Sequence, residues 1–279
     1  MVNFGSLSQK GSEQAATLRE NLAKAGKLVS GGIVLIIFLA LWEILPRTGI
    51  INAAFLPPFS EVLATLAAMT ISGEIFPHIF ISLERSLFGF GLAVLIAIPL
   101  GLALGWYPRF SRLMNPFIET TRNIPILALY PVLILFFGIG ELSKVAIIFV
   151  AAFWKILVNT ISGVSTVDPL LIKAARSVGM TSDTQILKKV VFPSAVPQIV
   201  AGLRLGATSA ILILVAAEML GAKSGLGFLV TNSQYNFEID KMYAAIICLV
   251  ILGVATNYLL VWLEKRATCW KEEVVHNED

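Results

Sequence analysis

Charged residues are scarce in this chain of 279 residues: they make up 14% of the sequence, whereas apolar residues make up 57%. Soluble domains carry about 25% charged residues and about 45–50% apolar ones, so the scarcity argues against a soluble protein. A formal net charge of +3 is too small to indicate nucleic-acid binding. The apolar residues suffice for about six membrane spans of roughly 20 residues each. We therefore predict an all-α, polytopic membrane protein.

Residues that support catalysis and metal binding are also few. The two cysteines, Cys248 in an apolar run and Cys269 in a charged segment, differ in predicted depth and lack metal-ligand spacing. The two histidines, His78 and His276, stand alone, and the sequence has neither a complete phosphate-binding loop nor a nucleophile elbow. We expect no catalytic residue, no metal site and no bound nucleotide, and an intramembrane enzyme is disfavoured.

Six apolar segments are long enough to be spans. They lie near residues 28–45, 86–106, 124–140, 145–165, 197–221 and 242–263. The chain thus divides into an N-terminal segment (1–27), a transmembrane domain (28–265) and a tail (266–279). Apolar residues at helical spacing among charges predict an amphipathic helix over 13–28.

Lysine and arginine collect on one side of these spans. Of the 21 such residues, 14 fall on the side that holds both termini and the 166–196 segment, five fall on the other side, and Lys155 and Arg204 fall within spans. Positive charge is enriched in cytoplasmic loops. We therefore predict a multi-pass protein of the inner (plasma) membrane with both termini in the cytoplasm.

The polar segment 166–196 contains residues that are typical of the ends of two short helices. Asp168 is a suitable N-cap, Pro169 fits the first helical position, and Gly179 suits the left-handed residue that ends a helix of about ten residues. Ser182 or Asp183 can cap a second helix. We expect Pro193 and Pro197 to break the chain before the fifth span.

One run in this segment, Lys173-Ala174-Ala175-Arg176-Ser177-Val178-Gly179 followed by Val190-Val191-Phe192-Pro193 and Pro197, resembles a known motif. It is similar to the EAA loop of the inner-membrane permeases of binding-protein-dependent ATP-binding cassette (ABC) importers. The resemblance implies the type I importer permease fold and a coupling helix that docks on an ATPase. The implied coupling residues are Pro169, Leu170, Lys173, Ala174, Ala175, Arg176 and Gly179. The alternative is an ordinary helix-turn-helix loop.

Lys173 stands where the motif has Glu, and a lysine there would favour an acidic groove on the partner.

Further motifs extend the resemblance over about residues 50–272. They are Leu56-Pro57-Pro58-Phe59, Ser82-Leu83-Glu84-Arg85, Phe136-Phe137-Gly138-Ile139-Gly140, Gly202-Leu203-Arg204, Ala216-Ala217-Glu218-Met219 and Gly225-Leu226-Gly227-Phe228. They look like the taurine, alkanesulfonate, nitrate and bicarbonate branch of these permeases, most of all its taurine and sulfonate members. The resemblance implies a small anionic solute, with taurine or an alkanesulfonate first, and nitrate, bicarbonate or a pyrimidine precursor of thiamine as alternatives.

The same resemblance implies partners. These are a second copy of the chain, two ATPase subunits that bind ATP and Mg, and a periplasmic or lipoprotein solute-binding protein, while this chain binds no cofactor itself. A self-contained channel or secondary carrier is the rival class. It would predict interrupted half-helices in corresponding halves of the chain, which the sequence does not display.

Ionisable side chains within spans are expensive and mark functional sites. Lys155, with Asn159 one turn later, would suit a small oxyanion in a translocation pathway, and Glu218 is a candidate for its outer gate. The alternatives for Lys155 are an ion pair with Glu218 or Glu43, or a side chain that reaches the membrane interface.

Overall fold

The computed structural model describes residues 32–267, and the chain forms two compact units, Met1–Thr65 and Leu66–Asp279. In the first unit a helix covers residues 32–47, which overlaps the predicted first span. The amphipathic helix predicted at 13–28 lies outside the described residues, as does the tail from residue 268.

Within the first unit, polar contacts fasten the helix over 32–47 to the segment that follows it. Trp42 Nε1 donates to the carbonyl of Pro57 at 3.1 Å. The Glu43 carboxylate accepts from Arg47 Nε at 2.7 Å and from the Ser60 backbone N–H at 2.9 Å. Directly after the proline pair begins α2 (Phe59–Ser72), a short helix that runs across the boundary between the two units.

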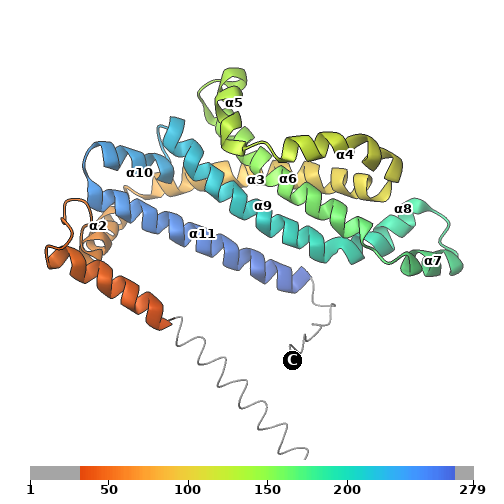
Figure 1. The fold of residues 1–279 in the computed structure, drawn as a ribbon, viewed down its shortest axis with the longest axis horizontal. Helices are drawn as coiled ribbons and strands as arrows, with labels where there is room; N and C mark the ends of the chain where they lie inside the picture. Colours follow the sequence, from red (N-terminus) through yellow and green to blue (C-terminus); the bar gives the residue numbers. More distant parts are fainter. Residues whose placement is uncertain (1–31, 268–279) are drawn as a thin grey trace, which may run out of the picture. The chain divides into compact units, whose positions relative to one another are not determined.

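Four long helices form the body of the second unit. They are α3 (Phe76–Trp106), α6 (Glu141–Ser165), α9 (Phe192–Gly221) and α11 (Ile239–Ala267), and they lie side by side (Figure 1). Among the described residues these four, with α9 extended back to residue 183, are single helices long and apolar enough to cross a membrane. At about 1.5 Å per residue, α3 alone exceeds the ~30 Å hydrocarbon core.

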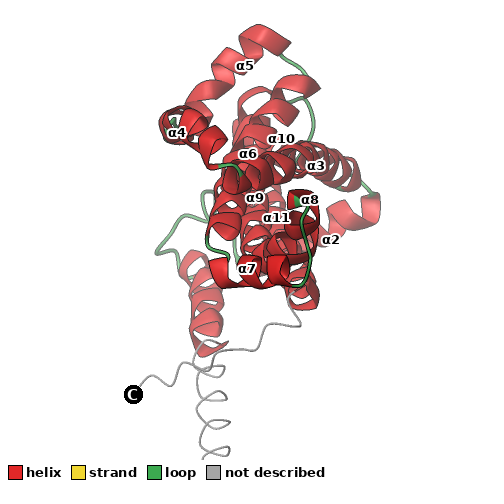
Figure 2. Ribbon diagram, turned by 90° about the vertical axis from the view of Figure 1, so that its right-hand side faces the viewer, coloured by secondary structure: helices red, strands yellow, loops and turns green. Residues whose placement is uncertain are grey.

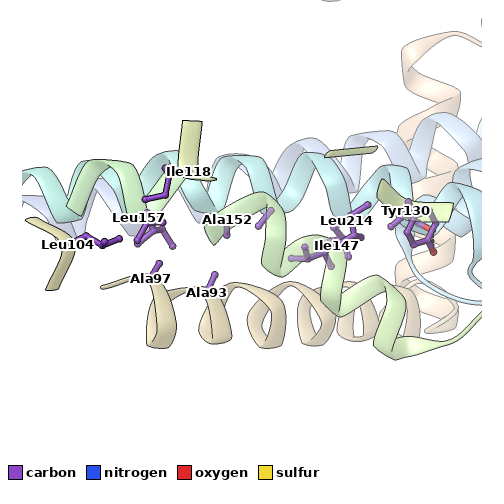
Figure 3. Packing of buried hydrophobic residues seen from close by; sticks show 13 residues of the cluster. Ala93, Ala97, Leu104, Ile118, Tyr130, Ile147, Ala152, Leu157 and Leu214 are labelled. Atoms are coloured by element: carbon purple, nitrogen blue, oxygen red, sulfur yellow. Dashed lines mark hydrogen bonds between the residues drawn. The ribbon is translucent and has the colours of Figure 1, made fainter. Parts of the chain in front are cut away.

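Small residues allow these helices to pack closely. Ala93 and Ala97 on α3 are completely buried against α6 (Figure 3). A Cβ placed on Gly101 would lie 2.6 Å from Thr160 Cβ. Because lipid tails are as apolar as the helices, close backbone packing is a main source of helix association in a membrane.

The residues that meet along α3 and α6 show that the two helices run in the same direction. Gly89 meets Ile148 near one end of the pair, and Gly105 meets Val164 near the other end. Two parallel helices require the chain between them to return across the bundle.

That return path is bent, so the span predicted near residues 124–140 is not one continuous helix. The helix α4 (Pro108–Arg122) is followed by a 3-10 turn (Ile126–Leu129) and α5 (Tyr130–Phe137), with a 90° bend between the two parts. Pro125 explains the break, because a residue that precedes proline avoids the helical region. Counted as one span, the bent pair is the fifth candidate span of the described residues.

Two predicted span boundaries also need correction. The second span begins at Phe76 rather than near residue 86. The fifth has no break at Pro193 and Pro197, because α9 begins at Phe192 and contains both prolines. Pro193 lies in the first turn of α9, where an amide proton is dispensable. A π-helical turn (Leu187–Val191) directly precedes α9 and connects α8 (Asp183–Ile186) to it.

Short helices cover the two ends of the bundle. At one end α7 (Pro169–Ser177) and α8 (Asp183–Ile186) connect α6 to α9, and Figure 2 looks onto this end. At the opposite end α10 (Leu226–Tyr235), which the sequence analysis did not predict, connects α9 to α11 (Figure 1).

The close packing of α3 on α6 gives a first testable prediction. Replacing Gly101 with leucine should destabilise the chain by about 1–3 kcal/mol, because overpacking displaces the α6 backbone. The matched control is Gly91→Leu on the same helix, since a Cβ at Gly91 meets nothing within 4 Å. Thermal unfolding in detergent micelles measures both, and equal unfolding temperatures for the two variants would contradict the packing described.

Candidate functional site

A buried arginine joins three helices at the α10 end of the bundle. Arg85 lies in α3 with only 3% of its side chain exposed. Its Nη1 donates to Glu218 Oε1 of α9 at 2.8 Å. Its Nε and Nη2 donate to the two carboxylate oxygens of Glu141 at the start of α6. This bidentate pairing fixes the orientation of the guanidinium as well as its charge.

The Glu218 carboxylate is completely buried and fully engaged. Besides Arg85 it accepts from Ser82 Oγ of α3 at 2.8 Å and from the Gly227 backbone N–H of α10 at 2.9 Å. Ser82 Oγ in turn accepts from the Leu226 backbone N–H at 2.9 Å. The side chains of α3 and α9 thus satisfy two of the amide groups that α10 leaves unpaired at its N-terminus.

Two glycines make room for this carboxylate. Gly225 has φ +117°, a conformation that favours glycine, and a Cβ there would lie 2.4 Å from Glu218 Cδ. A Cβ on Gly227 would lie 2.6 Å from the Val215 carbonyl oxygen. The two glycines of the Gly-Leu-Gly-Phe motif are therefore required by the shape of the Glu218 environment.

Lys144 balances the charge of the cluster. Its Nζ lies 3.2 Å from Glu141 Oε1, and its side chain is 4% exposed. We call Ser82, Arg85, Glu141, Lys144 and Glu218 the charged clamp. Arg85, Lys144 and Glu218 are buried, whereas Glu141 is 63% exposed, and the two carboxylates compensate the two buried cations. The clamp can hold α3, α6, α9 and α10 together at one end of the bundle.

The sequence analysis missed the clamp as a unit. Glu218 was predicted as a residue of the outer gate, or alternatively as the ion-pair partner of Lys155, and Arg85 was noted only as part of a motif. The sequence feature that could have indicated this pair is that Arg85 and Glu218 lie in two of the family-like motifs and carry opposite charges in apolar surroundings. His78, expected to stand alone, accepts the Gly225 backbone N–H at Nδ1, 3.1 Å away.

The predicted pathway residues do not come together. Glu218 is buried in the clamp, so it lines no open passage in this structure, and its partner is Arg85 rather than Lys155. Glu43 is bonded to Arg47 and Ser60. Lys155 is exposed at the middle of α6. Asn159 lies one turn along, and its Nδ2 donates to the Lys155 carbonyl at 2.7 Å.

At the opposite end of the bundle, the predicted helix pair is present. Asp168 caps α7 by accepting from the Leu170 backbone N–H at 2.7 Å. Gly179 ends α7 with φ +93°, and the following Met180 N–H reaches back to the Ala175 carbonyl at 3.1 Å. Ser182 precedes α8, but without a capping bond from its side chain. We call residues 168–191 the hairpin.

The hairpin is packed firmly onto the long helices. Ile186 and Val191 are completely buried together with Val164 at the end of α6, and Trp106 at the end of α3 packs against this cluster. A force on the hairpin therefore reaches the ends of three long helices through direct side-chain contact.

The hairpin exposes large apolar side chains beside charged ones. Leu170 is 68% exposed and Val178 is 77% exposed. Six of the seven predicted coupling residues are exposed as well: Pro169, Leu170, Lys173, Ala174, Arg176 and Gly179. The seventh, Ala175, is buried, with 7% of its surface exposed. Exposed apolar side chains on a rigid helix suit docking to another protein.

Metal-ligand clusters are absent from residues 32–267, where no group of three or more His, Cys, Asp or Glu side chains could hold an ion.

Residues 93–268 match the family described as binding-protein-dependent transport system inner membrane component. The taurine transport system permease protein TauC of Escherichia coli is 35% identical over 86% of this chain and 89% of its own length. The putative aliphatic sulfonates transport permease protein SsuC of Bacillus subtilis is 32% identical over 84% of this chain and 85% of its own. The formylaminopyrimidine transport permease protein ThiX of Halalkalibacterium halodurans is 28% identical over 83% of this chain and 94% of its own.

Among solved structures, the inward-facing MetNI methionine ABC transporter superposes with a TM-score of 0.62. It is 19% identical and covers 71% of this chain and 98% of that chain. The likeness supports the same all-α membrane fold.

A bundle of apolar helices with a protruding helical hairpin defines a class of protein, the membrane-spanning subunit of a transporter. More particularly, the chain belongs to the family of binding-protein-dependent ABC transporter permeases. It is a transport subunit, not an enzyme.

The clamp gives a second testable prediction. Arg85→Met should destabilise the chain by about 3–5 kcal/mol, because it leaves buried Glu218 without its cation. The double variant Arg85→Met/Glu218→Gln should recover part of this loss. Thermal unfolding in detergent measures both variants.

The matched control is Arg122→Met, which removes an exposed pair with Glu119 and should cost no more than about 1 kcal/mol. An Arg85 variant as stable as this control would refute the structural role of the clamp.

Proposed function

We propose that this chain is the permease subunit of an ATP-driven importer for a small anionic solute, taurine or an alkanesulfonate. The observation that carries the proposal is the exposed hairpin, which is rigidly attached to three spans. A chain that is expected to bind no nucleotide itself can use such a hairpin to receive work from an ATPase. Closure of the ATPases would draw the hairpins together, tilt the spans and switch the pathway from inward to outward facing.

The proposed assembly contains two copies of this chain, two ATPase subunits that bind ATP and Mg, and a periplasmic or lipoprotein solute-binding protein. One chain rarely encloses a passage alone, and a two-fold pair is the commonest closed arrangement. The hairpin and both termini face the cytoplasm. The charged clamp then lies toward the outer surface, on the side of the solute-binding protein.

The solute class rests on the relatives. Two of them are permeases for taurine and for aliphatic sulfonates, and a third is a permease for formylaminopyrimidine. Taurine and alkanesulfonates share a sulfonate group, so we favour a sulfonate solute. Competition experiments separate the alternatives. Taurine uptake is measured in a strain that depends on this transporter, with alkanesulfonates, nitrate, bicarbonate or formylaminopyrimidine added as the competitor. Uptake blocked only by formylaminopyrimidine would reject a sulfonate.

Lys155 is the residue we propose for anion binding in the pathway. It is exposed at the middle of α6, at the depth where Phe117 of α4 contacts the ring of Trp154. An exposed cation at this depth requires water or an anion rather than lipid. Asn159 and Gln198 lie where α6 packs against α9. A Cβ added at Gly202 of α9 would lie 2.7 Å from the Cβ of Asn159, and a Cβ added at Gly163 of α6 would lie 2.8 Å from the Cβ of Gln198. Both can supply amide donors.

The coupling role predicts that Leu170→Asp abolishes capture of the ATPase, because a carboxylate on the exposed face opposes apolar docking. The full-length chain should remain folded, since Leu170 makes no contribution to the buried hairpin core. Co-purification from the membrane measures capture. The control is Gln234→Asp, an exposed position on α10 at the opposite end. Retained capture by Leu170→Asp, and by Ala174→Glu, would reject the coupling assignment.

The anion role predicts that Lys155→Met raises the half-saturation concentration for sulfonate about tenfold, the loss of roughly one charge-assisted hydrogen bond. Lys155→Arg should retain near-normal affinity because it keeps the charge. Solute-stimulated ATP hydrolysis and uptake in reconstituted vesicles measure both variants. Unchanged affinity in Lys155→Met would show that Lys155 does not bind the solute.

A further inference from the structure

The last turn of α4 lies level with the middle of α6. Ile118 of α4 is buried in the same apolar cluster as Leu157 of α6 (Figure 3). The ring of Phe117 lies 6.5 Å from the ring of Trp154, which is near the middle of the 25-residue α6. Since α6 is a candidate span, the last turn of α4 lies near the middle of the membrane.

Two opposite charges lie on the exposed side of that turn. Arg122 Nη2 is 2.7 Å from Glu119 Oε2, and the two side chains are 39% and 50% exposed. Arg122 lies at most about 7.5 Å beyond Phe117 at roughly 1.5 Å per residue. That is less than the ~15 Å half-thickness of the hydrocarbon core. Exposed charges at this depth require water or protein rather than lipid beside them.

The backbone next to this ion pair is irregular. Residues 123–125 lie between α4 and the 3-10 turn, outside any helix, and all three are exposed. Irregular backbone at membrane depth is tolerated only where it is buried in protein or lines a water-filled cavity. Because this backbone is exposed on the chain, the helix break and the ion pair both favour a water-filled passage on this face of α4.

We propose that Glu119 and Arg122 form a binding subsite for a zwitterionic aminosulfonate in the translocation pathway. The ammonium group of the solute pairs with the Glu119 carboxylate, and its sulfonate group pairs with the Arg122 guanidinium. This inference rests on the proposed function. It narrows the solute from sulfonates in general to sulfonates that carry an ammonium group.

Charge balance selects a zwitterion over a plain anion. A zwitterion that binds between the two side chains replaces one ion pair with two and adds no net charge. An alkanesulfonate or nitrate has no positive group, so its binding to Arg122 would leave the Glu119 carboxylate without a cation at membrane depth. The partial negative charge at the C-terminal end of α4 also attracts the ammonium group.

Binding of radiolabelled taurine to the purified transporter complex, without its solute-binding protein, tests the subsite. Ethanesulfonate is the matched solute, because it has the same sulfonate and lacks the ammonium group. We expect taurine to bind about tenfold more tightly than ethanesulfonate. Glu119→Gln should weaken taurine binding about tenfold, the loss of roughly one charge-assisted hydrogen bond.

Two controls accompany this variant. Ethanesulfonate should bind Glu119→Gln at least as tightly as it binds the unaltered chain, which also shows that the variant is folded. Glu61→Gln removes an exposed carboxylate of α2 and should leave taurine binding unchanged.

Thiol labelling tests whether this face of α4 meets water. In a chain with Cys248 and Cys269 replaced by serine, Asn115→Cys and Asn123→Cys should react with membrane-impermeant sulfonatoethyl methanethiosulfonate, and taurine should slow the reaction. Both positions are exposed beside the ion pair. Leu95→Cys is the control, because Leu95 is an apolar residue near the middle of α3 that is 70% exposed. It should remain unlabelled.

Equal affinity for taurine and ethanesulfonate, in a complex that transports sulfonates, would overturn the inference and leave the proposed function standing. An unaltered complex that transports no sulfonate would reject both. Cysteines at 115 and 123 that resist the reagent and instead form disulfide-linked pairs would also overturn the inference, because a second copy would then cover this face of α4.

Discussion

The pairing of Arg85 with Glu218 and Glu141 is the constraint on which one end of the bundle depends. A guanidinium with 3% of its side chain exposed cannot remain in apolar surroundings without carboxylates. Meeting that need brings α3, the start of α6 and the end of α9 together. The same Glu218 carboxylate binds the first turn of α10. The positions of four helices thus follow from the compensation of one buried charge.

The clamp and the hairpin lie at opposite ends of α6 and α9. The 25 residues of α6 cover about 37 Å at roughly 1.5 Å per residue, and close glycine contacts hold α6 against both α3 and α9. Helices packed in this way move as a unit more readily than they deform. Work received at the hairpin would therefore appear at the clamp end as a rearrangement of α3, α9 and α10.

Much of the fold could be predicted from sequence, because membrane depth demands long apolar helices and short helices need caps. Asp168 and Gly179 marked the ends of α7 correctly through local backbone chemistry. The bend at Pro125 and the continuity through Pro193 were missed, because a proline ends, bends or merely begins a helix according to its tertiary surroundings. The pairing of Arg85 with Glu218 was missed because it joins residues 133 positions apart, a separation that no local pattern reveals.

Distances between spin labels test the central claim, that hairpin movement is transmitted to the clamp end. In a chain with Cys248 and Cys269 replaced by serine, labels at Val178 report on the hairpins and labels at Gln234 report on the opposite ends. We expect ATP binding by the assembled transporter to shorten the Val178–Val178 distance and to lengthen the Gln234–Gln234 distance. Hairpins that approach each other while the Gln234 distance stays constant would contradict it.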